Sequence, residues 1–193
     1  MATNTQVIEN FIKQTGKATH NGSGWDITLH YNGNFLYSYN TVIAKLDTTT
    51  NTILLSDTTM TPTTAKHRST LINEAIKNNI KVLPIPLTMH KAQFPTNEEV
   101  LNRFETRMDY LSRGTDLALA DKRKSFLTTF ADYTEFSKYA NITSENADKY
   151  TNISNSINDT NYLKTLMEKR RQFQAELRKN KAQLFMELDM SNG

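Results

Sequence analysis

The apolar residues of this chain follow two different periods, one in each half. Residues 25–30 alternate between apolar and polar, which is the pattern of a strand buried on one face, and further runs typical of strands, separated by turn residues, extend to residue 56. From Asn97 onward the apolar residues recur every three or four positions, which is the pattern of amphipathic helices. The two periods predict an α+β protein, with a sheet domain in residues 1–92 and a helical domain in residues 97–193.

The first domain is expected to contain a three-stranded antiparallel β-meander packed with one or two helices. The predicted strands are residues 25–30, 35–46 and 52–56, and they are separated by turns rich in Asn, Gly, Asp and Thr. A helix over residues 5–14, and a second helix that begins at Thr61 or Thr63, supply apolar faces that cover the sheet. Residues 80–87 contain two prolines, so we expect an edge strand or an extended crossing segment there.

The second domain is predicted to be a bundle of helices. Its first helix begins with an acidic turn at Asn97 and ends at Gly114. A second helix is expected over residues 116–139, and a short one within residues 141–158. The last helix, predicted from Asp159 to about Met190, fits a bundle or a short coiled-coil pairing. The residues near its heptad positions are Leu163, Leu166, Arg170, Phe173, Leu177 and Leu184.

Several kinds of catalytic and metal chemistry are disfavoured by the composition. The absence of cysteine excludes disulfides, Cys-based zinc sites and thiol catalysis. Neither a Gly-rich phosphate loop nor a G-x-S-x-G turn occurs, and Asp47 is expected to bond its own backbone in a turn. We therefore expect a binding protein, with no catalytic residue, metal or cofactor. The histidines show no paired ligand spacing; they are His20, His30, His67 and His90.

Hydropathy and charge bound the partners. No apolar run approaches the ~20 residues that span a bilayer, and the first residues lack the basic and apolar regions of a signal peptide. We therefore expect an intracellular protein with no membrane partner. Residues 1–92 carry 8 Lys or Arg against 5 Asp or Glu, whereas residues 93–193 carry 15 of each. The excess of positive charge in residues 1–92 permits a nucleic-acid partner but does not require one.

Two short segments carry a resemblance. The segment Leu36–Ala44 reads Leu-Tyr-Ser-Tyr-Asn-Thr-Val-Ile-Ala, and Thr63–His67 reads Thr-Thr-Ala-Lys-His. Over residues 25–80 the chain resembles a module of uncharacterised proteins of tailed bacteriophages, in which a Ser-Tyr-x-Thr-x-Ile-Ala strand precedes a Thr-Thr-Ser-Lys-His helix start. Ala65 stands where that module usually has Ser. The resemblance implies a phage origin, and with it a location in the host cytoplasm, but no activity.

The helix start at the second of these segments is a candidate anion site. Free backbone N–H groups, hydroxyls and cations at a helix N-terminus can converge on a phosphate or an acidic side chain. The candidate residues are Thr63, Thr64, Lys66, His67 and Arg68. The three basic residues are consecutive, however, so they fan around the helix and cannot all face one ligand. The alternative is structural: Thr63 or Thr64 caps the helix, and His67 packs or hydrogen-bonds onto the meander.

Two basic runs are the candidate partner-binding surfaces. One is Lys122, Arg123 and Lys124, and the other comprises Arg170, Arg171, Phe173, Arg178 and Lys181 on the last helix. Arginine and aromatic residues together are the usual anchors of interfaces. The alternative is a solvated face, since Glu168, Glu176 and Glu187 are interleaved for local pairing. The same helix is also a candidate for pairing with a second copy of the chain.

Two functional hypotheses follow. The first is a phage accessory protein that binds and inhibits a host protein or ribonucleoprotein complex, such as a CRISPR effector or another defence nuclease. The second is a nucleic-acid-binding phage protein of replication or gene regulation, which would use the basic surface directly. A metal-dependent nuclease is the enzyme alternative, although no cluster of acidic residues with the required spacing occurs.

Overall fold

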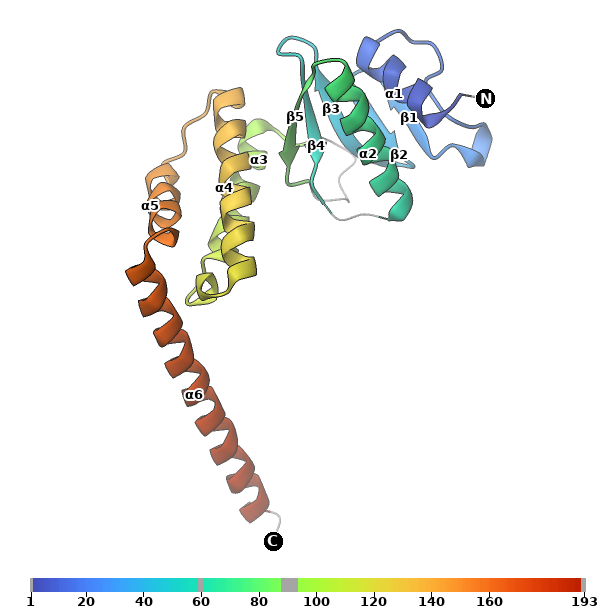
Figure 1. Cartoon of the computed structure of the whole chain (residues 1–193). Helices are drawn as coiled ribbons and strands as arrows, with labels where there is room; N and C mark the ends of the chain where they lie inside the picture. The colour runs from blue at the N-terminus through green and yellow to red at the C-terminus, as the bar shows by residue number, and fades with distance from the viewer. Residues whose placement is uncertain (1, 59–60, 88–93, 192–193) are drawn as a thin grey trace. The chain divides into compact units, whose positions relative to one another are not determined.

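The computed structural model describes residues 2–58, 61–87 and 94–191, with side chains in the last helix described to Lys181 and at Gln183. Within these residues the protein is α+β, as predicted, with one five-stranded mixed sheet and six α-helices (Figure 1). It divides into two compact units. The first comprises Met1–Phe104 with Asp132–Ile142, and the second comprises Glu105–Ala131 with Thr143–Gly193. This division differs from the boundary expected between residues 92 and 97, because helices of the second half contribute to both units.

The sheet has the order β1-β2-β3-β4-β5. Its strands are β1 (Leu29–Asn32), β2 (Phe35–Ser38), β3 (Thr41–Asp47), β4 (Thr52–Ser56) and β5 (Lys81–Ile85). Neighbours among the first four are antiparallel, and β5 pairs with β4 in parallel. Strand β5 is thus an edge strand, one of the two predicted alternatives, and an edge position accommodates Pro84, which has no N–H to donate.

The three-stranded meander of the prediction is a four-stranded one. The single strand expected over residues 35–46 is interrupted by a tight turn at Tyr39 and Asn40, where Tyr39 has a φ of 52°. No Gly or Pro marks this turn, so the sequence does not reveal it. Left-handed backbone of this kind is typical of Gly and Asn rather than of an aromatic residue.

The strand expected over residues 25–30 begins only at Leu29, and Trp25 is exposed instead of buried. Residues Gly24–Asp26 form a short 3-10 helix, η1. Before it the chain closes tightly, since a Cβ on Gly22 would lie 2.6 Å from the backbone oxygen of Asp26. The side chain of Asn21 accepts the backbone N–H groups of Thr28 and Leu29, both at 3.0 Å. These local bonds replace the ladder that an alternating strand would need.

Helices α1 (Asn4–Lys13) and α2 (Pro62–Lys77) lie on one face of the sheet (Figure 1). Thr3 and Gln6 form a capping box that fixes the start of α1. The core between the helices and the sheet is apolar, and its large members include Ile8, Phe11, Leu29, Leu36, Ile43, Ile53 and Leu71. Burial of each such side chain contributes roughly 1.5–3 kcal/mol, so this contact is the main stabilising feature of the first unit.

The remaining helices are α3 (Asn97–Leu111), α4 (Ala120–Ala140), α5 (Ala147–Ile157) and α6 (Thr160–Ser191), with a short 3-10 helix, η2 (Asp116–Ala118), before α4. In the second unit α5 is tied to α3. Glu105 accepts hydrogen bonds from Ser144 and from Asn146, the latter at 2.9 Å. Asp109 accepts from Lys149 at 2.6 Å and from the buried Tyr150 at 3.0 Å. The four helices predicted in the second half of the chain are all present, and their ends differ by a few residues from the predicted ends.

Candidate partner-binding surface

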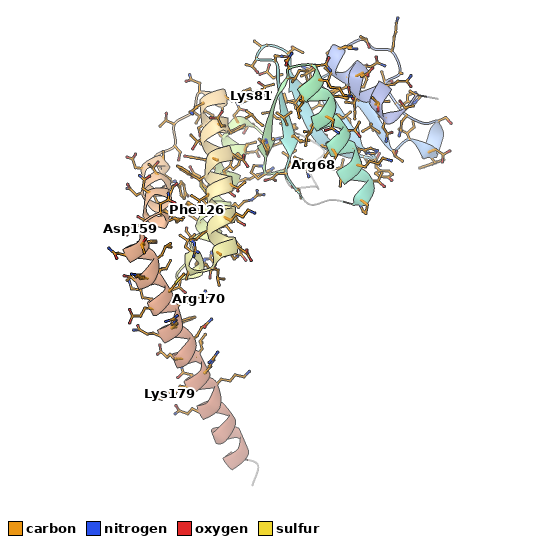
Figure 2. All side chains as sticks on the ribbon, in the orientation of Figure 1. Arg68, Lys81, Phe126, Asp159, Arg170 and Lys179 are labelled. Atoms are coloured by element: carbon orange, nitrogen blue, oxygen red, sulfur yellow. The ribbon has the colours of Figure 1, made fainter. Side chains whose placement is uncertain are left out.

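Helix α6 has two parts with different surroundings. Over residues 160–170 it packs on α5 and η2: Leu166 is buried, and Arg170 pairs with Asp116 of η2 at 3.4 Å. Every side chain from Arg171 to Lys181 is exposed. Figure 2 shows both parts, with Arg170 on the first and Lys179 on the second. We call residues 171–181 the exposed segment of α6; no packing inside the second unit explains its composition.

The exposed segment carries apolar and basic residues on the same side. At about 100° per residue, the five residues fall within one half of the helix: Phe173 lies at one margin, Arg171 and Arg178 lie at the other, and Leu177 and Lys181 lie between them. Phe173 is 55% exposed and Leu177 52%. Large apolar side chains beside arginines are the composition of interface anchors rather than of a solvated helix face.

The interleaved glutamates do not neutralise these arginines. Glu168 and Glu176 point away from the centre of the apolar and basic side. Among the described residues neither Arg171 nor Arg178 forms an ion pair. Between Thr160 and Lys181 the helix has seven Lys or Arg and two Glu, so this surface favours an acidic partner. The heptad position of Leu184 and the charge of Glu187 concern side chains outside the described residues.

Arg170 and Arg123 of the predicted set are held by groups of the second unit. Arg170 is held by Asp116, as described above, and Arg123 donates to the backbone oxygens of Leu117 and Ala118 at 3.0 and 2.8 Å. These oxygens lie in η2, where carbonyl groups lack helical partners, so Arg123 stabilises this short helix. Their guanidinium groups are less available to a ligand than those of Arg171 and Arg178.

The two lysines beside Arg123 face other groups of the second unit. The Lys122 ammonium lies 4.3 Å from the ring centroid of Tyr110, a cation–π contact. Lys124 lines a shallow hollow of about 700 Å³ together with Arg107, Tyr110 and Asp121. The basic run of α4 and the exposed segment of α6 therefore remain two separate predicted binding surfaces.

The predicted anion site is dispersed by the fold. Thr61 is the N-cap of α2, accepting from the Thr64 backbone at 3.3 Å. Thr64 and His67 are buried, whereas Lys66 is exposed, and Arg68 donates to the backbone oxygen of Thr58 at 3.4 Å. Figure 2 labels Arg68 on α2. Thr63 is half-buried and makes no side-chain bond that joins these groups. The N-terminus of α2 thus functions first as a structural joint.

His67 bonds onto the sheet, as the structural alternative predicts. Its Nδ1 lies 2.9 Å from the Ser38 hydroxyl at the end of β2, and the same hydroxyl lies 2.9 Å from that of Thr64. Burial lowers the pKa of His67, and the charge of the neighbouring Lys66 lowers it further. A neutral imidazole inside a hydroxyl network suits a joint better than an anion ligand, which would favour the charged ring.

The sequence analysis missed a second hollow surface, on the first unit. Trp25, His30 and Tyr39 are among the residues that line a pocket of about 510 Å³ beside β1. Its sign is an aromatic residue, Tyr39, placed in a turn, and the sequence alone does not show that Tyr39 lies in a turn.

Two features are absent from the described residues. In residues 2–58, 61–87 and 94–191, no group of three or more His, Asp or Glu side chains has a geometry that could hold a metal ion. Within the same part of the chain, no helix has the length and apolar character needed to cross a membrane.

Comparison with known proteins adds a family but no activity. Residues 5–82 match a family of unknown function, DUF8033. No curated protein and no solved structure matches the chain. The matched residues run from α1 through β1–β4 and α2 to Val82 of β5, so the likeness concerns the sheet of the first unit with its two helices and does not extend to α6.

Proposed function

We propose that this chain is a binding protein that attaches to a host protein or ribonucleoprotein complex through the exposed segment of α6 and inhibits it. The observation that carries the proposal is the composition of that segment: Phe173 and Leu177 are exposed beside Arg171 and Arg178. Such a surface costs solubility unless a partner covers it, and anchors of this kind dominate binding energies.

The wider biological role rests on the resemblance to phage proteins. Such a protein would act in the host cytoplasm by blocking a defence complex, for example a CRISPR effector. This role requires a binding surface and no catalytic activity. The partner is expected to present acidic or phosphate groups around an apolar recess, because the segment combines cations with two large apolar side chains.

The test compares two charge-matched double variants. Arg171→Ala with Arg178→Ala removes two cations from the apolar and basic side, while Lys169→Ala with Lys179→Ala removes two exposed cations from the other side. Wild-type chain is used to capture a complex from host lysate, and the purified complex is then titrated by calorimetry. We expect the arginine variant to bind about tenfold or more weakly, and the lysine variant to bind nearly as wild type.

The outcomes separate the hypotheses. Equal losses in both variants, or no loss in the arginine variant, would overturn the assignment of the surface. Mobility shifts with duplex and single-stranded nucleic acid over a salt series test the second hypothesis, that the chain binds nucleic acid directly. Direct binding through the arginines, weakening steeply with salt, would replace the proposed protein partner with nucleic acid.

A further inference from the structure

The pocket on the first unit is independent of the surface on α6. It lies beside β1 and has a volume of about 510 Å³, within the range of small-ligand sites. Its lining combines aromatic rings, two imidazoles and small polar groups, among them His20, Trp25, His30, Tyr31, Tyr39 and Asn40. No Asp, Glu, Lys or Arg contributes to this lining. The part of a ligand that enters is therefore expected to be uncharged.

Two aromatic side chains at this pocket are exposed to solvent, and one of them, Tyr39, also has a strained backbone. Trp25 is fully exposed on η1, and Tyr39 is 46% exposed. Tyr39 has a φ of 52° in a two-residue turn, a backbone that Gly or Asn adopts with less strain. Such strained residues concentrate at functional sites. Neither ring is explained by packing in the core, so their common position at one pocket points to a ligand.

The polar groups of the pocket suit the edge of a heterocycle. His20 Nδ1 lies 2.6 Å from the Gly22 carbonyl oxygen, which can only accept, so Nδ1 carries the proton and Nε2 of the neutral ring is an acceptor. His30, which also lines the pocket, stacks on Tyr37 with ring centroids 4.8 Å apart; its Nδ1 is buried behind the pocket surface and has no hydrogen-bond partner among the described residues. The amide of Asn40 adds both a donor and an acceptor.

We infer that this pocket binds the base of a nucleotide, either free or in a single strand. A nucleobase is flat, uncharged and polar at its edge, which matches two exposed rings beside imidazole and amide groups.

Trp25 is the only tryptophan of the chain, so its fluorescence reports on this pocket directly. The full-length protein is titrated with AMP, GMP, CMP and UMP, and with short single-stranded DNA and RNA homopolymers. We expect saturable quenching as a base stacks on the indole. Saturation by mononucleotides at similar concentrations assigns the site to free nucleotides, whereas markedly tighter binding of strands assigns it to single-stranded nucleic acid.

The Tyr39→Gly variant tests the assignment without endangering the fold, because Gly accepts the left-handed backbone of that turn. We expect its affinity for the tightest-binding nucleotide or strand to fall about tenfold, as loss of a stacking ring predicts. Tyr110→Ala, which removes an exposed ring from the second unit, is expected to leave binding unchanged.

Three results would overturn the inference: no saturable quenching by any nucleotide or strand, equal binding by Tyr39→Gly and wild type, or equal loss in Tyr110→Ala. The variant Arg171→Ala with Arg178→Ala is expected to keep the quenching. Its behaviour therefore distinguishes failure of the pocket from failure of the surface on α6.

Discussion

Ser38, Thr64 and His67 are polar residues buried together; the Ser38 hydroxyl pairs with the Thr64 hydroxyl and with Nδ1 of His67, whereas the buried Nε2 of His67 has no partner among the described residues. The Ser38 hydroxyl lies 2.9 Å from both partners, so it links the end of β2 to the first turns of α2. A buried polar group without a partner costs about 1–3 kcal/mol, which explains why these three occur as a set. The two segments that carry the phage resemblance thus meet through this contact.

This network predicts that stability decreases in mild acid. Burial lowers the pKa of His67, with Lys66 adding to the effect, and burial lowers that of His30, with His20 adding to it. The unfolded chain, with its ordinary histidine value of 6.5, therefore takes up protons first. The free energy of unfolding should be constant at higher pH and should fall as the pH drops below about 6.5.

Urea denaturation at a series of pH values between about 8 and 5 measures this effect. The His67→Gln variant should show a shallower decrease, and a variant with His30→Gln in addition should show almost none. An unchanged slope in the double variant would mean that other groups carry the pH dependence. The depressed pKa values of Asp47 and Asp109 affect stability only at lower pH, below the ordinary value of 3.8.

The residue scale also shows where sequence patterns are sufficient and where they fail. The sequence offers Thr61, Thr63 and Thr64 as caps of the helix near Pro62; Thr61 is the N-cap, and the alternative in which Thr63 or Thr64 caps the helix is wrong. Trp25 is predicted to be buried and is exposed. The chain after it is held by hydrogen bonds that the backbone N–H groups of Thr28 and Leu29 donate to the side chain of Asn21, and the spacing of apolar residues does not reveal these bonds. The sequence thus predicts that a threonine caps α2, but it does not predict that the hydrogen bonds of Asn21 replace the start of a strand.

At the scale of elements, Asp47 joins the β3–β4 turn to α4 inside the first unit. One carboxylate oxygen accepts from the backbone of Thr49 at 2.9 Å. The other accepts from the Thr50 hydroxyl and from the Tyr139 phenol, each at 2.8 Å. The Asx-type bonding predicted for Asp47 is confirmed. Burial and the carboxylate of Asp47 raise the pKa of Tyr139 to about 12, so the phenol keeps the proton it donates.

A double-mutant cycle tests this joint. Asp47→Asn keeps one carbonyl oxygen for the turn but replaces the oxygen that faces Tyr139, and Tyr139→Phe removes the donor. Each single change should lower the free energy of unfolding by about 0.5–1.5 kcal/mol. The double variant should lose clearly less than the sum, because both changes remove the same bond. Strict additivity in chemical denaturation would show that the two side chains do not stabilise each other.

The helices were easier to predict than the strands, for a physical reason. Apolar residues three and four apart must share a helix face, so the existence of α1 and α3 follows from spacing alone. The sheet depends on where the chain reverses. The reversal at Tyr39 uses a residue that rarely adopts this backbone, so the break between β2 and β3 was not foreseen, and the parallel addition of β5 depends on pairing with β4.

At the scale of the whole molecule, α6 is too long for the packing it receives. Its first part is held by Leu166 and by the ion pair of Arg170 with Asp116. Residues 171–181 bury no side chain. In an isolated chain this segment contributes little stability, and helices without tertiary contacts are marginal in water. The sequence predicts the helix and its basic side, whereas the loss of packing after Arg170 follows only from the fold.

This asymmetry predicts that removal of residues 171–193 leaves the stability of the chain nearly unchanged. The deletion should shift the melting temperature by less than about 2–4 °C, the shift that a loss of roughly 1 kcal/mol produces in a protein of this size. A larger decrease, measured by circular dichroism, would show that the segment packs on its own chain and is not available to a partner.

The same deletion also tests pairing of α6 with a second copy. Between Thr160 and Lys181 the cations outnumber the carboxylates by five, so parallel pairing would bring like charges together. We therefore expect a melting temperature that does not depend on protein concentration, and equal association states of the full and shortened chains in sedimentation. A melting temperature of the full chain that rises with concentration, and loses that dependence on deletion, would assign the apolar and basic side to a second copy, because mass action stabilises only the associated form.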